Sequence, residues 1–214
     1  FLDNAYIDIQ NLFTLPVALK LGRQNLMYGS GFVLFDGQSQ FASTSLYFDG
    51  VKATWGITDS ASLDLLYFKD QENNTNDGAK DDITLSGAYL TASCPVIGGQ
   101  QELYILNRND EGFESNGGKD IWLYGLRLSD KFPLGLDYSA EFAYQGGDFN
   151  ETANIDQDAM GYKFEAGWTF GLPVKPRLFA GYAFLSGDDD PNDDENNAWD
   201  VFYGGWPQYG DLLV

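Results

Sequence analysis

The clearest feature of the chain is an alternation of apolar with small or polar side chains. Between residues 134 and 145 every second position is apolar, and the same pattern returns between residues 160 and 171. Side chains on one face of a strand recur every second residue, whereas those on one face of a helix recur every third or fourth. Both segments are therefore predicted to be amphipathic strands.

Weaker versions of this alternation occupy most of the remaining chain. Together they predict ten strands, near residues 3–11, 16–24, 44–55, 61–70, 82–93, 101–108, 119–129, 134–146, 159–171 and 175–187, with a partial strand after Ala198. Short, turn-like connections such as KFPLG and GLPVK alternate with long, polar ones, at about 25–43, 70–81, 109–118, 147–158 and 188–198. Strands of about 9–11 residues that are joined in this way are typical of outer-membrane β-barrels.

The pattern thus predicts an all-β fold, an antiparallel up-and-down transmembrane β-barrel, as a single domain over residues 1–214. A soluble β-sandwich or lipocalin-like barrel would also alternate. Two observations favour the membrane. The apolar set is aromatic toward the strand ends, as interfacial girdles are, and the opposite set is rich in Gly, Ser, Thr and charges of both signs, as a wet lumen requires.

Composition excludes several classes of function. The formal net charge of −20 argues against a nucleic-acid binder, and the absence of histidine excludes Ser–His–Asp and Cys–His catalysis and histidine-based metal sites. Cys94 is alone, so no internal disulfide forms. No apolar run approaches the ~18 residues of a membrane-spanning helix, and Phe1 opens on a strand-like pattern, as expected of a mature fragment or of a soluble protein. An enzyme would need a carboxylate pair such as Asp137 and Glu141 on one strand face, where neighbours lie ~7 Å apart; we expect no enzymatic activity.

Several cations lie within strands on the side opposite to the apolar set. A Lys or Arg that faces lipid at mid-depth costs ~2–4 kcal/mol, so these side chains are expected in the lumen, where they would attract an anionic solute. They are Lys20, Lys52, Arg127, Lys163 and Arg177. An alternative is that they pair with Asp64, Asp137, Glu141 and Glu165 and fill a plugged barrel.

The acidic residues concentrate in the long loops, which predicts a negative outer rim. The densest run, SGDDDPNDDENN, suggests a weak candidate for a Ca²⁺ site formed by Asp188, Asp189, Asp190, Asp193 and Asp194. The run does not match the EF-hand pattern, so a solvated loop, or one bridged to lipopolysaccharide by divalent ions, is the stronger expectation. No other cofactor is expected.

One cation breaks the pattern. In LGRQNLMYGSGFVLFDG, strict alternation from Val17, Leu19 and Leu21 would place Arg23 in lipid. Glycine tolerates the positive φ of a bulge, so we predict a bulge at Gly22 that turns Arg23 into the lumen. The residues that follow Gln24 are predicted to fold inward and narrow the pore.

Three stretches resemble, in order, the alginate-export family of Gram-negative outer-membrane barrels: LGRQNLMYGSGFVLFDG, SLYFDGVKATW and SGDDDPNDDENNAWDVFYGGWPQYGDLL. The resemblance implies an eighteen-stranded barrel, of which this chain would be about half, with an arginine-lined lumen that passes an anionic polyuronate. It also implies that Arg23 and Gln24 face the pore at its constriction and that Asp49 anchors the strand after the inserted loop.

Two hypotheses for function follow. The first is an outer-membrane channel for passive passage of hydrophilic, anionic solutes or polysaccharide, in contact with outer-membrane lipid and lipopolysaccharide and open to a periplasmic export partner. The second is a structural or adhesive barrel whose acidic extracellular loops bind a partner or divalent cations.

Overall fold

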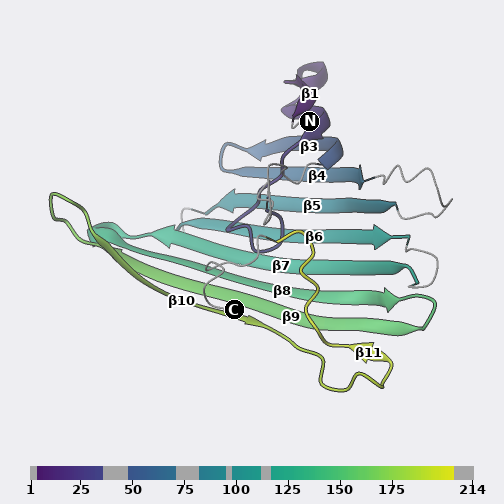
Figure 1. Ribbon diagram of the computed structural model, residues 1–214. Coiled ribbons are helices and arrows are strands. Elements are labelled where there is room, and N and C mark those ends of the chain that lie inside the picture. The colour runs from purple at the N-terminus through teal and green to yellow at the C-terminus, as the bar shows by residue number, and fades with distance from the viewer. Residues whose placement is uncertain (1–3, 36–47, 71–81, 95–97, 112–116, 205–214) are drawn as a thin grey trace.

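The computed structural model describes residues 4–35, 48–70, 82–94, 98–111 and 117–204. Within these ranges the strands form one sheet in which each strand from β1 to β10 pairs antiparallel with the next along the chain (Figure 1). The strands are β1 (Ala5–Ile9), β2 (Val17–Gln24), β3 (Phe48–Thr58), β4 (Ala61–Asp70), β5 (Ile83–Ser93), β6 (Gln100–Asp110), β7 (Lys119–Lys131), β8 (Leu136–Asn150), β9 (Ile155–Thr169), β10 (Arg177–Leu185) and β11 (Glu195–Asn196). The all-β, up-and-down prediction is confirmed, and the described sheet is open, as part of a barrel would be.

The remaining regular structure is limited to two short 3₁₀ turns, η1 (Leu12–Thr14) and η2 (Pro133–Gly135). Among the described residues, no helix is long and apolar enough to cross a membrane.

Two predicted boundaries are wrong. The long loop expected at 147–158 is a tight turn, because β8 continues to Asn150 and β9 begins at Ile155. Gly147 stays within β8 at φ 115, where a Cβ would overlap the carbonyl oxygen of Asp120 on β7, so this glycine serves the close strand pairing and does not begin a loop. No strand follows Ala198 in the described residues, where Tyr203 forms only an isolated bridge with Leu34, and the short strand β11 lies within the loop expected at 188–198 and pairs parallel to β9.

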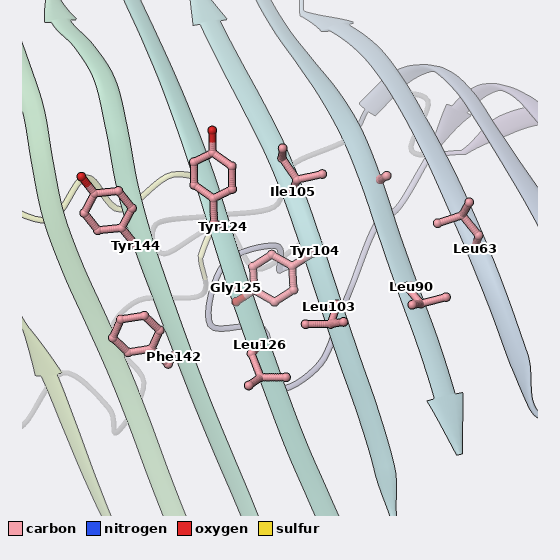
Figure 2. A pocket seen from close by; sticks show the side chains of 11 residues that line it. Leu63, Leu90, Leu103, Tyr104, Ile105, Tyr124, Gly125, Leu126, Phe142 and Tyr144 are labelled. Carbon is pink, nitrogen blue, oxygen red and sulfur yellow. The ribbon is translucent and has the colours of Figure 1, made fainter. Parts of the chain in front are cut away.

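Continuous register gives the sheet two distinct faces. One face, which we call the outer face, presents large apolar side chains to the exterior. Figure 2 shows Leu90, Leu103, Leu126 and Phe142, which come from neighbouring strands and line a shallow hollow of about 500 Å³ on this face. Leu103, Leu126 and Phe142 are each 41–51% exposed. An apolar surface that is open to the exterior over many strands fits contact with lipid.

The opposite, inner face carries the core. Two segments of chain, residues 25–35 and 197–204, pack against it and bury their apolar side chains there. Figure 1 shows the second segment, in yellow, running from β11 across the sheet toward β6. The core contains Leu26, Phe32, Val33, Leu34, Trp199 and Phe202 from the segments and Leu66, Phe68, Leu85, Leu106, Ile121 and Leu123 from the strands.

The two inward segments also contact each other. Leu34 forms an isolated β-bridge with Tyr203, and the amide of Phe35 donates to the Tyr203 carbonyl at 2.8 Å. The prediction that the chain folds inward after Gln24 is thus confirmed for residues 25–35, while residues 36–47 lie outside the described part of the chain.

Gly125 on the inner face of β7 makes room for an aromatic ring. A Cβ at this position would overlap the ring of Tyr104, which is 5% exposed. We expect Gly125→Ala to lower the free energy of unfolding by ~1–3 kcal/mol through overpacking, as measured by urea unfolding in lipid vesicles. Gly171→Ala is the control, because no atom lies within 4 Å of a Cβ there. Equal stability of the two variants would contradict this account.

Candidate channel-facing wall

Three tyrosines are stacked along the middle of the inner face. The ring of Tyr28, from the inward segment 25–35, lies 4.2 Å from that of Tyr89 on β5, and Tyr89 lies 5.1 Å from Tyr104 on β6, with an angle of 3° between the last two rings. Tyr89 and Tyr104 face each other in the strand register. The stack therefore joins the inward segment to two neighbouring strands.

Each of these tyrosines donates its hydroxyl to a carboxylate. Tyr28 donates to Asp64 at 2.6 Å, and the two other bonds are Tyr89 to Glu102 at 2.7 Å and Tyr104 to Glu141 at 2.9 Å. Burial, and then the charge and hydrogen bond of Asp64, raise the pKa of Tyr28 well above its usual range. Tyr28 thus stays a neutral donor at physiological pH.

The same carboxylates hold cations of the inner face. Lys52 lies 3.6 Å from Asp64, and Arg127 lies 3.1 Å from Glu102 and 3.8 Å from Glu141. The side chain of Arg127 is 13% exposed and those of both glutamates are 3% exposed. Buried charges require partners of this kind, because an unpaired charge in a low dielectric is costly.

A second group of charges lies nearer the turn end of the sheet. Arg177 on β10 bonds Asp137 through Nε at 3.1 Å and Nη2 at 2.6 Å, and its Nη2 also donates to Glu165 at 3.2 Å. Arg177 thus ties β10 to β8 and β9, and its guanidinium lies 5.0 Å from the ring of Phe179.

The five cations that lie opposite the apolar set in the alternating pattern are all on the inner face of the sheet. Lys163 faces Glu141 in the register, and the Nζ of Lys20 lies 4.4 Å from the centroid of Tyr6. The ion pairs of Lys52, Arg127 and Arg177 involve Asp64, Asp137, Glu141 and Glu165, the carboxylates that the alternative interpretation named.

The predicted bulge that turns Arg23 inward is wrong. Gly22 has a φ of 118, but pairing runs through it without a shift, with Arg23 opposite Ala5 on one side and Asp49 on the other. Alternation therefore puts Arg23 on the outer face, while the next residue, Gln24, is 1% exposed and faces inward. Arg23 need not turn inward because it lies one residue from the loop end of β2, where Nη2 meets Asp49 at 2.7 Å.

The expected spacing of Asp137 and Glu141 is also wrong. The two residues are four positions apart on β8, about 13 Å along a strand, and not adjacent on its face. Each is held by a different arginine, Asp137 by Arg177 and Glu141 by Arg127.

The second inward segment is fixed by a buried ion pair. Arg108 on β6 donates both terminal nitrogens to Asp200 at 2.8 Å, and the side chains are 11% and 13% exposed. Gln145 on β8 brackets the same residue, since its amide bonds the carbonyl of Asp200 at 2.7 Å and its oxygen accepts from the Asp200 amide at 2.9 Å. Burial raises the pKa of Asp200, but the hydrogen bonds and charge of Arg108 outweigh it, and the pKa lies below its usual range.

Sequence reasoning missed part of this wall. The alternation of side chains along β5 and β6 would by itself have placed Glu102, Tyr89 and Tyr104 on the inner face, because they stand at inward-facing positions of these strands. The same alternation places Arg108 on the inner face, but its pairing with Asp200 carries no comparable signal, since residues 197–204 have no period and the two partners lie 92 positions apart.

The acidic run between β10 and β11 makes bonds within its own loop. Asp190 accepts from Asn192, Asp193 accepts from the amide of Glu195, and Asp188 accepts from the amide of Asn197. In the part of the chain that the structure describes, no three His, Cys, Asp or Glu side chains are grouped to hold a metal ion. The proposed Ca²⁺ site therefore gains no support from the geometry.

Loss of the Asp200 carboxylate should release residues 197–204 from the wall. Asp200→Ala leaves Arg108 buried without its partner, so we expect stability to fall by ~3–5 kcal/mol. Amide hydrogen exchange in 197–204 should quicken, and Trp199, which is 8% exposed, should become open to iodide quenching. Asp190→Ala, whose carboxylate bonds only Asn192 in the described structure, is the control; equal protection in both variants would contradict the role of the ion pair.

Acid should release the same contact only below about pH 4. Because the folded pKa of Asp200 is lowered, its contribution is fully present above the unfolded pKa of ~3.9 and is lost as pH falls through the folded pKa. Iodide quenching of Trp199 measured against pH checks this, with Asp200→Asn lacking the transition. A transition centred above pH 5 would exclude Asp200 as its source.

Residues 2–212 match the alginate export family, whereas no curated protein matches the sequence. That family is an outer-membrane transport family, not a family of enzymes. A match over nearly the whole length, together with the antiparallel sheet, shows that the chain belongs to the alginate export family.

Proposed function

We propose that this chain forms the wall of an outer-membrane channel through which hydrophilic solutes, anionic sugars included, pass by diffusion. The observation that carries the proposal is that the two faces of the sheet differ in character, one being apolar and the other charged. Large apolar side chains lie exposed on one side of the sheet, and the five cations opposite the apolar set lie with their carboxylates on the other. Lipid on one side and a polar passage on the other account for both.

The inward segment 25–35 supports a narrow point at the level of the tyrosine stack. Gly29 approaches so closely that a Cβ there would lie 2.9 Å from Cδ of Arg127, and the hydroxyl of Ser30 donates to Glu141 at 3.1 Å. A solute that passes this level would meet fixed donors and acceptors, which orient it.

The pairing of the cations supports a modest preference for anions. Lys52, Arg127 and Arg177 each lie within 4 Å of a carboxylate, which offsets most of their long-range field. A polyanion would then be attracted only where the cation and the carboxylate of such a pair move slightly apart, because each of these three cations has a carboxylate beside it.

Conductance across a planar bilayer tests the proposal. The protein should conduct, and Arg127→Gln should shift the reversal potential in a salt gradient toward cations, because Glu102 and Glu141 are left unpaired. Arg23→Gln is the matched control, since it removes the same charge on the outer face and should leave the reversal potential unchanged.

Two results would overturn parts of this proposal. Absence of conductance from correctly folded protein would exclude the channel. A shift for Arg23→Gln as large as that for Arg127→Gln would show that the two faces are assigned wrongly.

A further inference from the structure

A hollow of about 540 Å³ opens on the inner face between the charged wall and the turn end of the sheet. Its lining includes Arg127 on β7 and Glu165 on β9, so it begins at the level where Gly29 touches the wall. The hollow therefore lies directly on the turn side of the narrow point formed by residues 25–35.

The floor of the hollow is one continuous row of polar side chains. The strand register places each member opposite the next, so five adjacent strands contribute one residue each. The row consists of Ser93, Gln100, Ser129, Ser139 and Glu165. Neighbours in such a row are about 5 Å apart.

The hydroxyls of this row are available to a solute. Within the described residues, no side-chain hydrogen bond engages Ser93, Ser129 or Ser139, although Gln100 bonds Glu102. A hydroxyl both donates and accepts, which suits the hydroxyls of a saccharide.

The charges around the row are balanced. Asp137 and Glu165 share Arg177, Arg127 is held by Glu102 and Glu141, and the remaining ionic lining groups are Lys131 and Asp130. Such a rim attracts neither anions nor cations strongly, because the fields of opposite neighbours cancel at short range.

We infer that this hollow is a binding site for an uncharged stretch of saccharide. Its volume falls in the range of ~300–1,000 Å³ common for ligand sites, and its floor offers hydroxyl and amide groups instead of net charge. The inference rests on the proposed function for the route by which the solute arrives, and it adds that the sugar is held on the turn side of the narrow point before passage.

Calorimetric titration of the purified protein in detergent tests this site without requiring conductance. The probes are the neutral trisaccharides maltotriose and cellotriose and the anionic trigalacturonate. A neutral trisaccharide should bind more tightly than trigalacturonate. Ser129→Ala and Ser139→Ala should each weaken its binding about fivefold, and the double variant about 25-fold, as expected for lost neutral hydrogen bonds.

Ser86→Ala is the matched control, because Ser86 lies on the outer face of β5, in register with Tyr67, and should leave binding unchanged. Tighter binding of trigalacturonate, no binding of either neutral probe, or no effect of the double variant would overturn the inference. Conductance separates the two proposals. A conducting protein that binds no neutral sugar contradicts only this site, whereas a protein that binds sugar through Ser129 and Ser139 but does not conduct contradicts only the channel.

Discussion

Uninterrupted backbone pairing is the constraint on which the structure depends. In hydrocarbon each backbone amide and carbonyl must bond within the sheet, so a strand cannot slip by one residue without exposing all its polar side chains to lipid. From β2 to β9 the register shifts only near strand ends, at Gly56–Thr58 and at Asp148–Asn150. The alternation of side chains along each strand therefore decides which of them lie on the outer face and which lie on the inner face.

The ion pairs of the inner face follow from this separation of the two faces, because charged side chains that lie together on one face must neutralise each other. Removing a cation from water is costly unless a carboxylate and further hydrogen bonds replace the solvent. Arg127 has Glu102 and Glu141 beside it, and both glutamates also accept from tyrosines. The cations that the sequence shows on this side thus become part of a network in which Lys52, Arg127 and Arg177 each lie beside a carboxylate.

The strands and the inner cations could be predicted from sequence because both depend on period two. The depth of Arg23 could not, because the sequence of β2 does not show how far its last residues lie from the loop edge of the sheet. β2 has eight residues and β9 has 15, yet both strands reach the same loop edge of the sheet. At that edge Arg23 pairs with Asp49 in the strand register, and Asp148 pairs with Asp156. Barrel strands are staggered, so height must be measured from the loop edge. There the outer face is polar, and an arginine bonded to Asp49 avoids the cost that the bulge was meant to relieve.

The contacts of the two inward segments could not be predicted from the alternating pattern, because they join residues far apart in sequence. Ser30 and Glu141, for example, lie 111 positions apart. The packing of the two segments nevertheless shows how firmly they are held against the inner face. Leu26, Phe32 and Leu34 are at most 2% exposed, and burial of each contributes ~1.5–3 kcal/mol. Because Leu34 is also bridged to Tyr203, displacing residues 25–35 would break the contact with the segment anchored by Asp200. The two segments therefore form one packed layer on the inner face, and neither can be displaced without loss of the contact between them.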